Sequence, residues 1–220
     1  MIVILIVRSL CFGDGADSVV IFCFWKGGFP MKELEEKILK EGTVLPGEIL
    51  KVGSFLNQQI DTTFLMQMGK EVAGLFSGEK ITKVLTIEAS GIPFAFATAV
   101  ALDVPMAFAK KHTTSNIGGG VYTATVHSYT QNKDYDIVIG KEYLKETDRI
   151  LIADDFLALG NALCGLIKLV KISGASLAGC TVAIEKGYQG GGDSLRKQGI
   201  RIESLAIVET MSDHSLTFRS

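Results

Sequence analysis

The sequence predicts an α/β fold with a central, mostly parallel sheet that is flanked by helices. Three observations lead to this class. Short apolar runs, which are typical of buried strands, alternate along the chain with segments of helical periodicity. Most of these runs end in a turn of small or polar residues, as strands do where a helical crossover begins. The chain has 220 residues, which is enough for one such domain with a complete core.

The composition narrows the range of partners. Lys and Arg number 22 against 24 Asp and Glu, so the net charge of −2 provides no basic surface for nucleic acid and no basic run for a membrane. None of the four cysteines belongs to a C-x-x-C pair, so we expect reduced, buried thiols in a cytoplasmic protein. The histidines, cysteines and acids show no paired spacing that predicts a metal site built by the protein alone.

Residues 1–30 differ from the rest of the chain. They contain two apolar runs, each shorter than the roughly 18 residues that cross a bilayer, and Asp14 and Asp17 lie between the runs. A basic region before the first run and a small-residue cleavage site are both missing, which argues against a secretory signal. Because Met31 is followed at once by an amphipathic pattern, we expect residues 1–30 to be an upstream extension outside the fold, and 31–220 to form a single domain. A membrane anchor is the competing interpretation, which the central acids disfavour.

The first elements after this extension are predicted in order. Apolar residues on one helical face predict a helix over 31–41, which Gly42 ends. Residues 43–57 carry apolar residues without clean periodicity and predict short strands and loops that pack over a site. Asp61 is expected to cap a helix that contains Phe64 to Phe76 and is closed by Gly78.

The alternation of strands and helices begins with the apolar run 83–87. A small-residue turn follows it, then a helix over about 93–103 and a strand over 105–109. Residues 110–120 have almost no apolar anchor and predict a mobile loop. An antiparallel pair of strands is predicted next, at 121–128 and 135–140, with a turn at 131–134.

The stretch 150–162 contains the most informative pattern. It begins with the apolar run Ile-Leu-Ile-Ala, which predicts a buried strand. Asp154 and Asp155 follow, then a small-residue turn with Gly160, and then a helix expected over 161–173. The remaining predicted elements are strands at 179–185, 202–208 and 216–218, a glycine-rich loop at 186–192, and a short helix capped by Asp193 or Ser194.

Three loops that follow three predicted strands, at 88–91, 110–120 and 154–162, are expected at one edge of the sheet. In a parallel sheet the carboxyl ends of the strands form the ligand-binding edge. One loop provides two carboxylates and an anion-binding turn, another provides small residues, and the third provides two adjacent lysines. Such a set would suit a sugar that carries two separate phosphate groups.

Residues 150–162 resemble the phosphoribosyl-diphosphate (PRPP) signature of the type I phosphoribosyltransferases, although Ala158, Leu159 and Ala162 stand where hydroxyl residues are common. Within that family, the A-x-G-x-A form of the turn resembles the bacterial xanthine phosphoribosyltransferases. Further segments resemble the same subfamily, at residues 31–38, 49–52, 54–61 and 86–92. The resemblance runs from Met31 to the C-terminus and excludes the extension.

The resemblance implies the type I phosphoribosyltransferase fold with a small hood, formed by about residues 31–60 and the C-terminal segment, over the base site. It implies that xanthine and PRPP react to give xanthosine 5′-monophosphate (XMP) and pyrophosphate in purine salvage. Mg²⁺ is expected to enter bound to PRPP, and the enzyme is expected to be a homodimer.

Site residues follow from the resemblance position by position. The 5′-phosphate is assigned to Ala158, Leu159, Gly160, Asn161 and Ala162. The ribose hydroxyls are assigned to the catalytic pair Asp154 and Asp155, and the pyrophosphate to Glu88, Ala89, Ser90 and Gly91, with Lys110 or Lys111 closing over it. The base is assigned to Leu50, Asn57 and Lys186.

Two alternatives stay open. A PRPP-sensing regulator could keep this fold without catalysis, although the chain lacks the basic module that such a protein would use on DNA. A guanine or hypoxanthine phosphoribosyltransferase is the nearest rival among enzymes. A lysine at position 186 favours an oxopurine but does not separate xanthine from those two bases.

Overall fold

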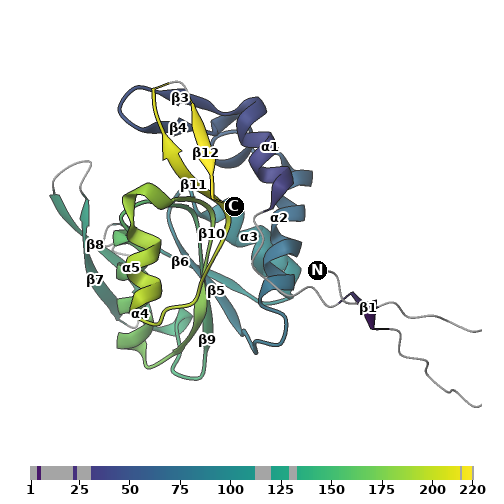
Figure 1. Cartoon of the computed structure of the whole chain (residues 1–220). Helices are drawn as coiled ribbons and strands as arrows, with labels where there is room; N and C mark the ends of the chain where they lie inside the picture. The colour runs from purple at the N-terminus through teal and green to yellow at the C-terminus, as the bar shows by residue number, and fades with distance from the viewer. Residues whose placement is uncertain are drawn as a thin grey trace, which may run out of the picture.

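The computed structural model describes residues 4–5, 22–23, 31–111, 120–128, 133–213 and 215–219. Its central sheet contains the strands β5 (Lys83–Ile87), β6 (Met106–Ala109), β9 (Arg149–Leu157), β10 (Ser176–Lys186), β11 (Ile202–Met211) and β12 (Leu216–Phe218). The strands lie in the order β12-β11-β10-β9-β5-β6 (Figure 1). All pairs are parallel except β11–β12 at one edge. The predicted α/β class with a mostly parallel sheet is therefore confirmed.

Helices cover both faces of this sheet. They are α1 (Lys32–Glu41), α2 (Thr62–Leu75), α3 (Ile92–Leu102), α4 (Asn161–Ser173) and α5 (Gly191–Lys197) (Figure 1). Alternation along β9 divides the core in two, because Leu151 and Ala153 belong to a cluster with α1, α2 and α3, whereas Ile150 and Ile152 belong to a cluster with α4. Asp61 caps α2 as predicted, since its side chain accepts a hydrogen bond from the Phe64 N–H at 3.0 Å.

A small hairpin follows α1. Its strands β3 (Thr43–Leu45) and β4 (Ile49–Lys51) are antiparallel, and a π-helical turn, η1 (Gly53–Asn57), comes next. This confirms the short strands and loops predicted over 43–57. The hairpin lies at the top of Figure 1 near β12, and apolar residues of both segments belong to one hydrophobic cluster.

A second hairpin packs beside the sheet. The strands β7 (Val121–Ser128) and β8 (Lys133–Gly140) are antiparallel, so β8 starts two residues before the predicted strand. Helix α4 packs on this hairpin at Gly165, where an added Cβ would lie 2.3 Å from Val126 Cγ2. Short 3₁₀ turns complete the described chain, namely η2 (Lys141–Tyr143) and η3 (Gly187–Gln189).

Several predicted boundaries are wrong, including those of β10, which starts three residues before the predicted strand at 179–185, and of β11, which ends three residues after the predicted strand at 202–208. Strand β9 was expected to end before the acids, but it runs to Leu157 because its pairing with β10 continues to that residue. Helix α2 ends at Leu75 with Phe76 as its C-cap, so Gly78, at φ +92°, closes the turn that follows and not the helix itself. Helix α5 starts at Gly191, and neither Asp193 nor Ser194 caps it, because Gly190 is the N-cap and the Asp193 carboxylate binds arginines instead.

Some expectations fall on residues outside the described ranges. Within residues 1–30, the structure describes a two-stranded antiparallel pair, β1 (Ile4–Leu5) and β2 (Phe22–Cys23). The interpretation of that segment as an extension, the mobility of the loop at 112–119 and the turn at 131–132 therefore stay predictions. Across the described part of the chain, no helix has the length and apolar character needed to cross a membrane.

Candidate active site

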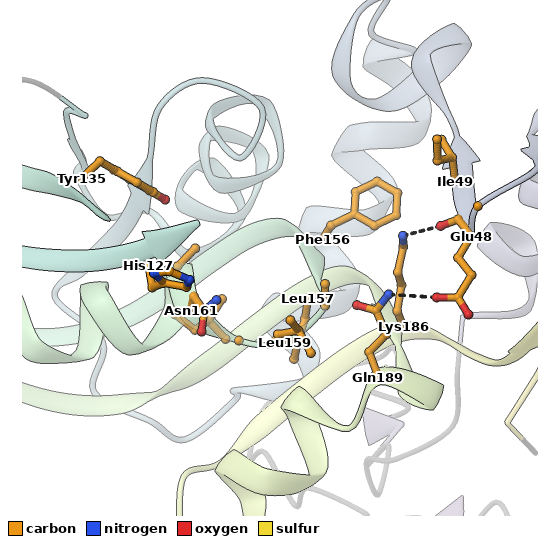
Figure 2. Close-up of a pocket in the computed structure, with 15 residues that line it drawn as sticks. Glu48, Ile49, His127, Tyr135, Phe156, Leu157, Leu159, Asn161, Lys186 and Gln189 are labelled. Carbon is orange, nitrogen blue, oxygen red and sulfur yellow. Dashed lines mark hydrogen bonds between the residues drawn. The ribbon is translucent and has the colours of Figure 1, made fainter. Parts of the chain in front are cut away.

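A cavity of about 510 Å³ opens at the carboxyl ends of β9 and β10. Figure 2 shows Lys186 and Glu48 at one end of it, His127 and Tyr135 at the other, and the turn after β9 between them. The cavity therefore joins segments that are far apart in the sequence. Its lining residues are Gly47, Glu48, Ile49, His127, Tyr135, Phe156, Leu157, Ala158, Leu159, Gly160, Asn161, Ala162, Leu163, Lys186 and Gln189.

The turn after β9 presents backbone groups with the geometry that suits an anion. Gly160 is left-handed at φ +88°, and α4 begins directly after it without a side-chain cap. The first N–H groups of a helix have no partner within the helix and carry the positive end of its dipole, so this turn favours an anion. The five residues predicted to hold the 5′-phosphate all line the cavity, at Ala158, Leu159, Gly160, Asn161 and Ala162.

The end of the cavity at Lys186 presents hydrogen-bond donors beside apolar walls. The Lys186 ammonium donates to the backbone carbonyl of Glu48 at 2.8 Å, and the Gln189 side-chain amide donates to the Glu48 carboxylate at 3.4 Å (Figure 2). Burial lowers the pKa of Lys186, and the nearby Glu48 charge opposes this shift. Phe156 and Ile49 provide apolar surface next to these groups. This end suits a flat polar ring with an oxygen acceptor.

Two residues predicted at the base site do not line the cavity. Leu50 is buried in the hydrophobic core, and its neighbour Ile49 lines the cavity instead, because successive residues of a strand point to opposite faces. Asn57 lies close to the acid pair, where its amide donates to Asp155 Oδ2 at 3.0 Å. Their contacts with a base stay predictions.

The acid pair is almost fully buried, with Asp154 and Asp155 each 5% exposed. Asp155 accepts hydrogen bonds from Asn57 at 3.0 Å and from the Ser90 hydroxyl at 2.9 Å. Asp154 Oδ1 accepts the backbone N–H of Asp155 at 3.0 Å. Burial and the neighbouring Asp155 carboxylate raise the pKa of Asp154 well above its usual range, whereas the hydrogen bond from the Asp155 backbone N–H and the Lys111 charge act in the opposite direction. A carboxyl in this condition costs stability, which is typical of a functional site.

The three loops that the sequence placed at one edge do meet there. Their strands β6, β5 and β9 are neighbours in the sheet. Glu88 accepts the Lys111 backbone N–H at 2.8 Å, and Ser90 donates to Asp155. Hydrogen bonds therefore connect loop 110–120 to loop 88–91, and loop 88–91 to loop 154–162.

Loop 88–91 also carries two backbone features. The peptide bond between Glu88 and Ala89 is cis. Gly91 packs so closely that an added Cβ would lie 2.4 Å from Asp154 Oδ1 and 2.5 Å from Thr86 Oγ1. The glycine at this position therefore makes room for the acid pair.

The two lysines after β6 differ in their surroundings. The backbone of Lys110 pairs with Val138 of β8 by two hydrogen bonds of 2.8 Å, whereas the exposed Lys111 ammonium lies 5.9 Å from the centre of the Tyr135 ring. Lys111 is also the lysine whose charge acts on Asp154. Of the two lysines, Lys111 is therefore the one whose charge reaches the acid pair.

Metal binding by the protein alone is limited. Within the described ranges, no three His, Cys, Asp or Glu side chains gather in a way that could hold a metal ion. The buried carboxyl groups of Asp154 and Asp155 fit a cation that brings most of its own ligands, because two side chains supply too few ligands to hold an ion alone.

Sequence reasoning missed several cavity residues, at Glu48, Ile49, His127, Tyr135, Phe156 and Gln189. Phe156 could have been found, since it directly follows the acid pair in a stretch that was already singled out. Glu48 and Gln189 carry no local signal, because only the tertiary fold brings the hairpin tip to the end of β10.

The family model for the phosphoribosyl transferase domain matches residues 63–208. That range contains the acid pair, the phosphate turn and the three connected loops. The chain therefore belongs to the phosphoribosyltransferase family.

Curated relatives narrow this class. The chain is 50% identical to the xanthine phosphoribosyltransferase of Lachnoclostridium phytofermentans over 191 residues, which cover 86% of this chain and 98% of the relative. It is 50% identical to the enzyme of the same name from Brevibacillus brevis, across 86% of this chain and 96% of the relative. The resemblance to bacterial xanthine phosphoribosyltransferases that the motifs indicated is thus confirmed.

Solved structures agree on the fold. Adenine phosphoribosyltransferase from Thermoanaerobacter pseudethanolicus superposes with a TM-score of 0.65 at 22% identity and covers 79% of this chain and 98% of that one. The Giardia lamblia enzyme in complex with 9-deazaadenine gives a TM-score of 0.67 at 22% identity, across 84% and 100% of the two chains. These structures confirm the type I phosphoribosyltransferase architecture.

Proposed function

We propose that this chain is a xanthine phosphoribosyltransferase, which converts xanthine and PRPP to XMP and pyrophosphate in purine salvage. One observation carries the proposal. A single cavity joins an anion-binding turn, at the end of β9, to the Lys186 ammonium at the end of the neighbouring strand β10. A nucleoside monophosphate has the same layout, with a phosphate at one end and a base at the other.

The sugar phosphate would bind at the acid pair and the turn after it. Backbone N–H groups at 158–162 would hold the 5′-phosphate, and the absence of hydroxyl side chains in the turn leaves this task to the backbone. The carboxylates of Asp154 and Asp155 would face the ribose hydroxyls, and Asp155 is already aligned by Asn57 and Ser90.

The reaction itself needs no nucleophilic side chain. The bond from ribose C1′ to the diphosphate oxygen breaks, the purine nitrogen forms a bond to C1′, and the proton of that nitrogen is lost to solvent. Positive charge develops on the sugar, where Asp154 and Asp155 would stabilise it, and negative charge develops on the leaving pyrophosphate. Loop 88–91 would contact the pyrophosphate with backbone groups, and Lys110 or Lys111 would supply positive charge to it.

The base would bind under a hood formed by the β3–β4 hairpin and the C-terminal strand β12. Lys186 would donate to an exocyclic oxygen of xanthine, with Phe156 and Ile49 against the ring faces. Leu50 and Asn57 lie outside the cavity lining, and contacts of these two residues with the purine face and its polar edge would need them to turn toward the base on binding. Because Lys186 hydrogen-bonds to Glu48 O, a bound oxopurine would have to replace that carbonyl as the acceptor.

Mg²⁺ would enter with PRPP, bound mainly by the diphosphate and the ribose hydroxyls. When bound, the ion neutralises phosphate charge. Asp154 and Asp155 are the residues of this chain that would approach it, and the charge of a cation would favour the ionised form of the buried Asp154 carboxyl.

We further propose a cytoplasmic homodimer. The outer side of α3 and the edge strand β6 expose Phe96 (56% exposed), Val100 (49%) and Phe108 (38%). A patch of large apolar side chains such as this one would be covered in a dimer.

The test is base competition in a steady-state assay with PRPP and Mg²⁺, on protein that starts at Met31. XMP formation with a higher kcat/KM for xanthine than for guanine or hypoxanthine is expected. A higher kcat/KM for guanine or hypoxanthine would reassign the substrate. Absence of turnover with all three bases, together with PRPP-dependent binding to DNA, would identify a regulator.

A further inference from the structure

We propose that Glu185 and Arg196 are positioning residues, which set the spacing between the Lys186 ammonium and the phosphate-binding turn at 158–160. This inference rests on the proposed function, because it concerns how the two ends of the substrate site are held apart.

Glu185 is the residue before Lys186 and lies at the end of β10. Its side chain is 1% exposed, yet it carries a carboxylate. Arg196 of α5 binds both carboxylate oxygens, with Nη1 at 2.9 Å from Oε1 and Nη2 at 2.6 Å from Oε2. Ser204 of β11 donates to Glu185 Oε2 and accepts a hydrogen bond from Arg196 at 3.2 Å. The bidentate pair therefore anchors α5 to two neighbouring strands of the sheet.

Helix α5 in turn contacts the phosphate-binding turn. Gly191, its first residue, is so close that an added Cβ would lie 2.2 Å from the Ala158 carbonyl oxygen and 2.5 Å from the Leu159 carbonyl carbon. Leu195, one turn later, lies 3.2 Å from the corresponding Cβ position at Gly160. The backbone of the turn thus rests on the first two turns of α5.

Helix α5 also contacts the Glu185–Arg196 ion pair, which is called the anchor below. An added Cβ at Gly192 would lie 2.1 Å from Glu185 Oε1. Neighbouring glycines therefore contact the two parts that must be held in register, with Gly191 on the phosphate turn and Gly192 on the carboxylate next to Lys186. Asp193, the next residue, binds Arg196 at 3.2 Å and Arg219 at 3.1 Å, which adds a second tie near the start of the helix.

A part-buried ion pair contributes little net stability to the position of a helix, although Glu185 itself is 1% exposed. Desolvation of two charges offsets most of their attraction, and well-packed apolar residues often give equal or greater stability. What the pair does provide is a fixed geometry, since a forked guanidinium on a carboxylate permits few orientations. A ligand that spans both ends of the cavity depends on that geometry, whereas a ligand that occupies one end does not.

The experiment compares a spanning ligand with a fragment. Arg196→Met removes the anchor, and the double variant Glu185→Met/Arg196→Met removes it without leaving a buried, unpaired charge. Arg201→Met is the matched control, because Arg201 makes ion pairs with Glu79 and Glu203 at the opposite, amino end of β11. Affinities for XMP and ribose 5-phosphate are measured by calorimetry, and kcat at saturating xanthine and PRPP.

A displacement of about 1 Å between groups that must be aligned can lower the rate of a reaction by up to about 100-fold. We expect both anchor variants to lose about 10- to 100-fold in kcat and in XMP affinity. The affinity of both anchor variants for ribose 5-phosphate should stay within about threefold of the wild-type affinity, because the turn itself keeps its backbone N–H groups. Arg201→Met should match wild type in all three measurements.

Gly191→Ala provides a second route that leaves the ion pair in place. The added methyl would push α5 from the turn, so XMP should lose more affinity than ribose 5-phosphate does. Gly74→Ala is its control, since nothing lies within 4 Å of that Cβ position.

Two outcomes would overturn the positioning role. One is a double variant with the kcat and XMP affinity of Arg201→Met, and the other is an equal loss of affinity for XMP and ribose 5-phosphate in every variant. Wild-type protein that neither forms nor binds XMP would instead overturn the proposed function, and this proposal with it.

Discussion

Replacement of Asp154 by Asn should make the protein more stable and less active. The Asp154 carboxyl is 5% exposed and adjoins the Asp155 carboxylate, so its ionised form is unfavourable in the folded state. Its one backbone contact, the hydrogen bond that Oδ1 accepts from the Asp155 N–H at 3.0 Å, can be kept by the amide oxygen of Asn. The substitution therefore removes a charge and preserves the shape.

The size of the gain follows from the charges around the site. Two unit charges about 4 Å apart repel by about 4 kcal/mol at an effective dielectric constant of 20. The Lys111 charge cancels part of this repulsion. Because single stabilising substitutions commonly gain about 0.5–2 kcal/mol, we expect a net gain in this range, which corresponds to a rise in Tm of roughly 1–8 °C for a domain of this size.

The pH dependence has a definite sign. Because the pKa of Asp154 is raised in the folded state, the native protein holds this proton more tightly than the unfolded chain does. Wild-type stability should therefore fall as the pH rises above the unfolded value of about 3.9. The difference in Tm between Asp154→Asn and wild type should be small near pH 4 and larger at pH 8.

Thermal unfolding at several pH values and XMP formation by the same samples check this prediction. A variant that is less stable than wild type at pH 8, or a Tm difference that does not change with pH, would refute the electrostatic reasoning. Full retention of kcat/KM would refute a catalytic role for Asp154 and leave the stability argument standing.

Three further changes test other parts of the molecule. Asp155→Asn should lower kcat/KM by about 100-fold or more, because it removes charge next to the sugar on which positive charge develops. The far-ultraviolet circular dichroism spectrum should not change. An unaltered kcat/KM would contradict the role assigned to Asp155. Lys186→Met should raise the KM for xanthine by about 10- to 100-fold, because it removes one charged hydrogen bond. The affinity for ribose 5-phosphate, measured by calorimetry, should not change. Equal losses of affinity for xanthine and for ribose 5-phosphate would argue against base recognition by Lys186. Gly165→Ala should destabilise the fold by about 1–3 kcal/mol, because the new methyl would lie 2.3 Å from Val126 Cγ2. Thermal unfolding measures this loss, with Gly74→Ala as the control because nothing lies within 4 Å of that Cβ position. Equal Tm values for the two variants would show that α4 and β7 can separate freely.

Local patterns were sufficient for most of the secondary structure. The predicted strand at 83–87 and the predicted helix at 161–173 coincide with β5 and α4, because an apolar run and a helical stripe are both properties of a few consecutive residues. The neighbourhood of the three loops also followed from the sequence, since parallel strands place their carboxyl ends on one edge.

The burial of the acid pair was less accessible to sequence reasoning. Asp154 and Asp155 looked like turn residues because they are charged and precede a glycine. They are strand residues because β10 continues to pair with β9 as far as Leu157, and a pairing partner 28 residues away leaves no local mark.

By itself, the sequence determined the class of fold, the anion-binding turn after β9 and the resemblance to a family, all of which depend on short segments with their own periodicity or motif. The tertiary structure alone decided that Ile49 and not Leu50 lines the cavity, that Glu48 meets Lys186, and that an ion pair fixes α5 beneath the phosphate turn. These features depend on the directions in which side chains point and on contacts between distant segments. Packing sets both, and packing is a property of the whole chain.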